Sequence, residues 1–196
     1  MPLIYSNAFY TVAFVFLFLA WCVSELTGPA RWQGSDKAHK QDRGSTMLLA
    51  ASSGMGVLFF FVLPLFIPQA TVTPLTRFMF FGGVPIVIGG TGLRWQAIKT
   101  LGASFTGSVL IDEAHSLVCV GPYKYLRHPS YTGILLVVIG FGLMMGNWLS
   151  LLSIFIGMLI GLLYRISIEE AALCQHFGQV YRDYMATTKR LIPFLF

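Results

Sequence analysis

The sequence has few charged residues. Only 11% of its 196 residues are Asp, Glu, Lys or Arg, whereas 56% are hydrophobic and the mean hydropathy is +0.72. Soluble globular domains carry about 25% charged residues, so this composition argues against a soluble protein. Several apolar runs approach the roughly 20 residues that an α-helix needs to cross a bilayer. The composition therefore predicts an integral membrane protein.

Cysteine is scarce as well, and the basic residues form no cluster. Cys22, Cys119 and Cys174 are odd in number and far apart, with no paired metal spacing, which favours buried or interfacial thiols. Thirteen Lys and Arg against eight Asp and Glu give a net charge of +5, but the basic residues are spread over three polar segments. Nucleic-acid-binding proteins concentrate basic residues on one face. We therefore expect neither a nucleic-acid partner nor a bound metal.

The apolar runs predict five transmembrane helices. The longest run, residues 131–164, is too long for one span and about right for two. Gly146-Asn147 interrupts it, and this dipeptide is typical of turns, so we predict a helical hairpin that turns at Gly146-Asn147-Trp148. The N-terminus has no basic residue before its first apolar run, which argues against a cleaved signal peptide. The other three spans are expected at about residues 8–23, 47–67 and 78–98.

The whole chain, residues 1–196, is expected to form a single all-α membrane domain. Residues 1–98 would hold the three N-terminal spans, and residues 99–196 the hairpin with most of the polar motifs. Beyond the hairpin, aromatic and aliphatic residues recur at helical spacing over residues 167–187, which predicts an amphipathic helix along the membrane surface. Gly178 weakens this helix and marks a candidate break.

The basic residues also predict an orientation. The loop after the first span, the central polar segment and the tail are basic, whereas the link between the second and third spans has only Arg77 near it. Cytoplasmic loops of membrane proteins carry an excess of Lys and Arg. With five spans all three basic segments fall on one side, so we predict that the C-terminus and the polar motifs face the cytoplasm.

Two polar groups flank the predicted hairpin. Residues 115–131 gather His, Arg, Tyr and turn-forming residues before it, and Arg165 lies with Glu169 and Glu170 near its end. A hairpin returns its ends to the same side of the membrane, so the two groups should lie close together. Arg165 and Glu169 are four residues apart and share one face of a helix. Ionisable residues at membrane depth line a cavity or pair with each other, so a polar pocket is predicted here.

Each of these features also has a plain structural explanation. Arg165 and Glu169 would form an ion pair at the interface, and their spacing does not decide between the two roles. His128 alone would be a polar loop residue, and the tyrosines near it would be interfacial aromatics. The glycines of the third span favour close helix packing over a ligand site; they are Gly82, Gly83, Gly89, Gly90 and Gly92.

The C-terminal half contains a series of short motifs. They are Leu101-Gly-Ala-Ser104-Phe105, His115-Ser-Leu-Val118, Gly121-Pro-Tyr123, Arg127-His-Pro-Ser-Tyr131, Arg165 with Glu169-Glu170, and Phe177-Gly-x-x-Tyr181-x-x-Tyr184. Their order and spacing over residues 101–193 resemble the isoprenylcysteine carboxyl methyltransferase family. The first three spans resemble that family only in being hydrophobic.

The resemblance implies a membrane methyltransferase that uses S-adenosylmethionine and a lipophilic acceptor, with the carboxylate of a prenylated cysteine as the expected acceptor. It implies catalytic roles for Arg165 and Glu169, with Arg165 binding the acceptor. One departure is that residues 106–114 form a shorter segment than in the eukaryotic enzymes, so a cofactor contact there is not carried over. The residues that the resemblance assigns to the cofactor are His115, Ser116, Leu117, Val118, Tyr123, His128, Pro129, Ser130, Tyr131, Glu169 and Glu170.

The chemistry is consistent with a carboxylate acceptor, which is ionised at neutral pH and needs no general base. Arg165 would orient such an acceptor. An amine or a thiol on another lipid would need a base, and no residue stands out for that role.

Two alternatives come from other classes. One is an NADPH-dependent membrane sterol reductase, which shares a similar His-Pro-x-Tyr element in a longer chain, and the other is a scaffold or small transporter without a cofactor site.

Overall fold

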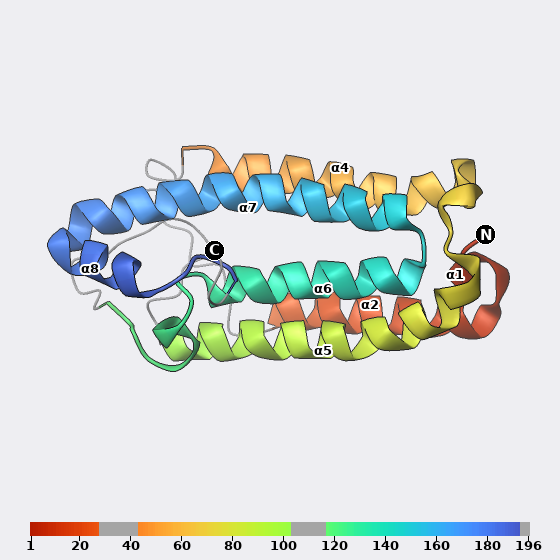
Figure 1. Cartoon of the computed structure of the whole chain (residues 1–196), viewed down its shortest axis with the longest axis horizontal. Coiled ribbons are helices and arrows are strands. Elements are labelled where there is room, and N and C mark those ends of the chain that lie inside the picture. Colours follow the sequence, from red (N-terminus) through yellow and green to blue (C-terminus); the bar gives the residue numbers. More distant parts are fainter. Residues whose placement is uncertain (28–42, 103–116, 193–196) are drawn as a thin grey trace.

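The computed structural model describes residues 1–27, 43–102 and 117–192, and these residues form helices and loops without a β-strand. The long helices run side by side along the long axis of the molecule (Figure 1). The predicted all-α fold is therefore confirmed for the described residues. The helices are α1 (Leu3–Ser6), α2 (Ala8–Thr27), α4 (Ser45–Phe66), α5 (Thr76–Leu101), α6 (Pro129–Met145), α7 (Trp148–Phe177) and α8 (Gln179–Thr187), with 3-10 turns η1 (Pro68–Ala70), η2 (Thr73–Leu75) and η4 (Gly121–Lys124).

Helices α2, α4, α5 and α7 are long and apolar enough to cross a membrane. Helix α6 is also apolar, and its 17 residues reach the lower limit of about 17 for a transmembrane helix. The three predicted N-terminal spans lie on α2, α4 and α5, and their ends agree to within about one helical turn. The turn of the predicted hairpin lies between α6 and α7, as expected.

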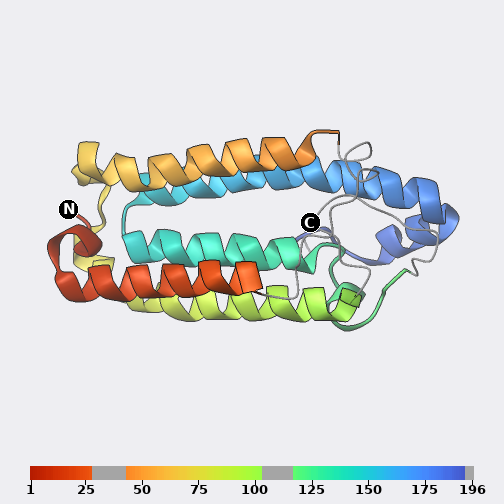
Figure 2. The ribbon, with the colours of Figure 1, turned by 180° about the vertical axis from the view of Figure 1, so that it is seen from behind.

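The two arms of the hairpin pack mainly on other helices. Helix α6 lies along α5 and helix α7 lies along α4, while the direct contact between α6 and α7 is less extensive. Opposite views show α4 with α7 on one side and α5, α6 and α2 on the other (Figures 1 and 2). The hairpin therefore joins two helix pairs instead of forming one.

Glycine at the contact surfaces explains this pairing. A Cβ atom added to Gly90 would lie only 2.7 Å from the carbonyl oxygen of Gly133 on α6, and one added to Gly56 would lie 2.9 Å from that of Ser153 on α7. Small residues allow helix backbones in a membrane to approach this closely. By contrast, a Cβ atom at Gly82, Gly89 or Gly92 would meet nothing within 4 Å. The packing role predicted for the glycines of the third span is thus confirmed for Gly90, and also for Gly83, which faces α6.

Aromatic side chains fill the space between the two helix pairs. Phe14 on α2 lies in contact with Phe60 on α4 and Phe141 on α6, with ring centroids 6.2 Å and 5.5 Å away. All three rings are buried, with at most 3% of their surface exposed. This core holds both helix pairs in one unit.

The turn between α6 and α7 is anchored to the link before α5. Gly146 has a positive φ of 68°, a conformation that glycine adopts without steric cost. Its carbonyl accepts a hydrogen bond from the Val72 N–H at 3.0 Å, and the Asn147 side chain caps α7 by accepting from the Ser150 N–H at 3.1 Å. Capping satisfies one of the N–H groups that a helix start leaves without a partner. The molecule is thus closed at the end opposite to the predicted site.

One predicted helix differs in where it begins. The amphipathic helix was expected to begin near residue 167, but α7 continues without a break to Phe177 and α8 contains only nine residues. Arg165 and Glu170 are buried by neighbouring segments. These polar residues are therefore accommodated inside the helix and do not end it. The break lies at Gly178, with φ at +59°, as its residue type suggested. At 1.5 Å per residue α7 is about 45 Å long, longer than the roughly 30 Å hydrocarbon core, so its polar end extends beyond that core.

Candidate active site

Arg165, Tyr131 and Glu169 form the centre of the polar end. Arg165 Nε donates to the Tyr131 hydroxyl at 2.8 Å and to Glu169 Oε1 at 3.1 Å. The Tyr131 hydroxyl in turn donates to Glu169 Oε1. The first turn of α6 and the last third of α7 are therefore joined through a charged network, as the hairpin prediction required.

Arg165 also reaches a third helix. Its Nη1 donates to the Thr46 hydroxyl at 2.9 Å, and Thr46 lies in the first turn of α4. The Arg165 side chain is 5% exposed, whereas that of Glu169 is 19% exposed. A buried guanidinium is costly unless it is paired and hydrogen-bonded, and here both conditions are met. The predicted ion pair exists, and the Glu169 carboxylate is the more accessible of the two groups.

His128 lies between the two glutamates. Its Nδ1 is 3.5 Å from Glu169 Oε2 and its Nε2 is 3.5 Å from Glu170 Oε1. The ring stacks on Tyr131 with an interplanar angle of 11°. Within the described part of the chain, the buried Nε2 atom has no partner with hydrogen-bond geometry. The two ring nitrogens of His128 thus face the two carboxylates, which places His128 in the same polar cluster.

Glu170 has a different surrounding from Glu169. It accepts hydrogen bonds from Arg127 Nε at 2.7 Å and from Arg190 Nε at 3.0 Å. Arg127 also donates to the carbonyl oxygens of Met185 and Thr188. Because these groups surround the carboxylate and only 5% of its side chain is exposed, Glu170 ties the loop before α6 to the C-terminal segment. Its predicted contact with a cofactor stays a prediction.

The C-terminal segment closes over the loop before α6. The Arg127 N–H donates to the Lys189 carbonyl at 2.7 Å, and the Tyr184 hydroxyl on α8 donates to the Tyr123 carbonyl at 2.6 Å. Burial raises the pKa of Tyr123 well above its usual value; Tyr184 and Glu169 add to the rise and Arg94 opposes it. Burial likewise raises the pKa of Tyr184. Both hydroxyls are therefore neutral at physiological pH.

A second arginine approaches the same turn of α6 from the other side. Arg94 on α5 donates through Nη1 to the Ser130 hydroxyl at 2.6 Å. Its Nε lies 2.8 Å and 2.9 Å from the two carboxylate oxygens of Glu25, near the end of α2. Glu25 and Arg94 were not among the predicted site residues. The only sequence signal was an isolated charged residue within or at the end of an apolar run, which suggests a paired or functional group but does not name its partner.

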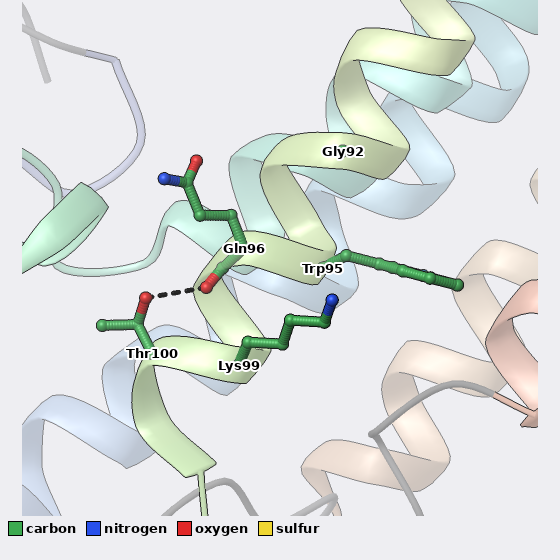
Figure 3. Close-up of a pocket in the computed structure, with 5 residues that line it drawn as sticks. All are labelled: Gly92, Trp95, Gln96, Lys99 and Thr100. Carbon is green, nitrogen blue, oxygen red and sulfur yellow. Dashed lines mark hydrogen bonds between the residues drawn. The ribbon is translucent and has the colours of Figure 1, made fainter.

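A shallow groove lies on the other face of α5 (Figure 3). Its volume is about 510 Å³, and Lys99 Nζ lies 5.8 Å from the centroid of the Trp95 ring. At 100° per residue the lining residues share one face of the helix, and Arg94 projects from the opposite face. The groove thus lies on a face of α5 that points away from Arg94. It is lined by Gly92, Trp95, Gln96, Lys99 and Thr100.

The remaining predicted site residues are placed as follows. Tyr123, Pro129 and Ser130 are buried around the start of α6. Leu117 and Val118 are half-buried in the segment that leads into η4. His115 and Ser116 lie outside the described residues. The structure therefore brings together the predicted residues from Tyr123 onward.

Comparison with known proteins finds a family similarity over the segment that holds this site. Residues 83–175 match the family model of the isoprenylcysteine carboxyl methyltransferase (ICMT) family. The resemblance is confirmed. The matched segment contains α6 and all of α7 except its last two residues, and so it includes Tyr131, Arg165 and Glu169.

Curated relatives and a solved structure agree with the ICMT match. Protein-S-isoprenylcysteine O-methyltransferase B of Arabidopsis thaliana is 36% identical over 115 residues, which cover 58% of each chain. Protein-S-isoprenylcysteine O-methyltransferase of Tribolium castaneum is also 36% identical over 115 residues, 58% of this chain and 41% of the relative. A solved structure of a eukaryotic intramembrane Ras methyltransferase, ICMT, aligns with a TM-score of 0.55 and 33% identity, over 76% of this chain and 52% of that one. The chain therefore spans only about half of the length of these ICMT proteins.

Proposed function

We propose that this protein is a membrane methyltransferase that transfers a methyl group from S-adenosylmethionine to the carboxylate of a prenylated cysteine. The observation that carries the proposal is the Arg165–Tyr131–Glu169 network at one end of a helical membrane bundle. The curated relatives are named as enzymes of this activity. The network lies in the matched segment, which supports the same chemistry here.

The polar end contains residues that fit the methyl donor. S-adenosylmethionine carries an ammonium, a carboxylate and a sulfonium whose methyl group is electrophilic. The partly exposed Glu169 carboxylate would hold a cationic part of it, and the buried His128 Nε2, without a hydrogen bond among the described residues, would hold a polar part. Tyr123, Ser130 and Tyr131 border the same space, and His115, Ser116, Leu117 and Val118 precede it in the chain.

Arg165 is proposed to hold the acceptor carboxylate. Its planar guanidinium can bind a carboxylate with two parallel hydrogen bonds, which lysine cannot do. The orientation of this guanidinium is fixed before an acceptor binds, by Tyr131, Glu169 and Thr46. An acceptor that binds to a group already in place is held in the right geometry for the reaction, which lowers the barrier. The acceptor oxygen is already ionised, so no residue has to remove a proton from it.

The proposed site faces the cytoplasm. The basic residues Lys124, Lys189 and Arg190 lie at this end of the molecule, and the positive-inside rule favours a cytoplasmic location for them. Single cysteines introduced at Lys37, Lys124 and Lys189 should all react with an impermeant thiol reagent from the same side. If one of these positions were labelled from the other side, the proposed orientation would be rejected.

Two measurements on the purified full chain test the activity. S-adenosylhomocysteine should raise the unfolding temperature and bind in calorimetry, whereas NADPH, the cofactor of a sterol reductase, should do neither. The protein should then transfer the methyl group of radiolabelled S-adenosylmethionine to an S-farnesylcysteine derivative, giving a base-labile ester. An acceptor in which the carboxylate is replaced by a primary amide serves as control and should remain unlabelled. Binding of NADPH without S-adenosylhomocysteine would reject the proposal.

A further inference from the structure

We propose that Glu25 and Arg94 are positioning residues that set the location of Ser130 and thereby the affinity of the site for the methyl donor. The inference rests on the proposed function and extends the site to α2. Glu25 precedes the segment that matches the ICMT family, residues 83–175. The part of Glu25 in this role therefore lies outside the family match, whereas Arg94 and Ser130 lie within it.

The contacts form a continuous chain from α2 to α6. The Glu25 carboxylate faces Arg94 Nε through both oxygens, at 2.8 Å and 2.9 Å. Arg94 Nη1 then donates to the Ser130 hydroxyl at 2.6 Å. The side chains of Arg94 and Glu25 are only 11% and 23% exposed, so solvent weakens this pair less than it weakens a surface ion pair. Glu25 therefore controls which way the guanidinium points.

The backbone of α5 is held close to α6 at this position. A Cβ atom added to Gly133 would lie 2.8 Å from the Cβ atom of Arg94. At such a close approach Arg94 cannot shift toward α6, and its guanidinium reaches Ser130, which lies three residues before Gly133. The direction of the Arg94 side chain is then set mainly by its ion pair with Glu25.

Ser130 joins this chain to the candidate active site. It is 5% exposed and directly precedes Tyr131, whose hydroxyl contacts Arg165 and Glu169. The first turn of α6 is thus held from one side by Arg94 and from the other by Arg165. A change at Glu25 should therefore be transmitted to the residues proposed to hold the methyl donor.

A double-mutant cycle on the full chain tests this inference. Glu25→Gln should weaken S-adenosylhomocysteine binding by roughly 3- to 10-fold. The expected loss is that of about one hydrogen bond, because the contact between Arg94 and Ser130 is disturbed. In a Ser130→Ala background the same change should alter affinity by less than about twofold, since residues that act through one contact are not additive. In kinetic assays the KM for S-adenosylmethionine should rise while kcat changes little. Glu25→Asp keeps the charge and should retain part of the affinity. It replaces Glu25→Gln in the cycle if the glutamine variant does not fold.

The matched control is Ser24→Ala. Ser24 is adjacent in the same helix turn, and its hydroxyl donates to the Trp21 carbonyl within α2 at 2.8 Å. This variant should bind S-adenosylhomocysteine as the unmodified protein does. A Glu25→Gln effect of equal size with and without Ser130 would overturn the inference, as would a lower unfolding temperature with unchanged affinity. If the unmodified protein did not bind S-adenosylhomocysteine, the proposed function itself would be rejected.

Discussion

Replacement of Arg165 by lysine separates the two roles of this residue. As an acceptor-binding group, Arg165 needs its planar fork, because two parallel hydrogen bonds fix the position of a carboxylate. As a structural group, it needs only a positive charge beside Glu169. Lysine keeps the charge and loses the fork, so Arg165→Lys should abolish the first role and retain most of the second.

The contacts of Arg165 give the expected size of each effect. Nε donates hydrogen bonds to Tyr131 and Glu169 at 2.8 Å and 3.1 Å, and Nη1 donates one to Thr46 at 2.9 Å. A lysine ammonium can stay near Glu169, so the affinity for S-adenosylhomocysteine should fall by less than about threefold. Loss of one charge-assisted hydrogen bond to the acceptor costs about 1.5–3 kcal/mol, which corresponds to a turnover that is roughly 10- to 150-fold slower.

Both quantities should be measured on one preparation of the variant. Calorimetry with S-adenosylhomocysteine gives the affinity, and methyl transfer to a farnesylcysteine derivative at saturating donor gives the turnover. Near-normal turnover would refute the acceptor-binding role. A loss of affinity that matches the loss of turnover would instead support a purely structural ion pair.

Thr46→Val is the matched control for this experiment. The change removes the hydroxyl that accepts from Arg165 Nη1 and leaves the guanidinium itself intact. If Arg165 acts by binding the acceptor, Thr46→Val should slow turnover far less than Arg165→Lys does. Equal effects of the two variants would show that the contact with α4 is what matters.

Three further predictions concern neighbouring residues. Glu169→Gln should weaken S-adenosylhomocysteine binding by about 1.5–3 kcal/mol in calorimetry, the range for hydrogen bonds to charged groups; unchanged affinity in a folded protein would make Glu169 structural. Glu170→Ala should destabilise the fold by about 3–5 kcal/mol in chemical unfolding, because it leaves the buried Arg127 without its carboxylate; a loss below about 1 kcal/mol would contradict its role as an anchor. Gly90→Ala should cost about 1–3 kcal/mol through a clash with α6, whereas Gly89→Ala, which faces open space, should be neutral or stabilising.

Much of the fold could be predicted because its cause is local. A run of about 20 apolar residues forms a helix in a membrane whatever its neighbours are, since the backbone must satisfy its own hydrogen bonds there. The turn at Gly146 and Asn147 was predicted from its residue types, and the structure shows the positive φ and the helix cap that these residues favour. The length of α7 was not predicted, because the polar residues near Arg165 were expected to end the span, whereas the helix continues through them to the break at Gly178.

The site was predictable where its residues lie close together in the sequence. The spacing of Arg165 and Glu169 places them on one helix face, which is compatible with the ion pair that the structure shows. Their proximity to Tyr131 followed from the hairpin. Their roles toward a methyl donor and an acceptor came from the resemblance to the ICMT family, and they stay predictions until binding is measured.

The sequence by itself determined the membrane-spanning helices, the turn that joins α6 to α7, and the group of polar residues at one end. Only the tertiary structure decided the partners of those residues. Glu169 and Glu170 are adjacent in sequence, but successive residues of a helix project about 100° apart, so one faces Arg165 and the other faces Arg127 and the C-terminal segment. Glu25 and Arg94 are 69 residues apart, and they meet because aromatic contacts such as Tyr10 with Phe80 place α2 beside α5. Such pairing depends on how whole helix surfaces fit together, and no local sequence pattern specifies it.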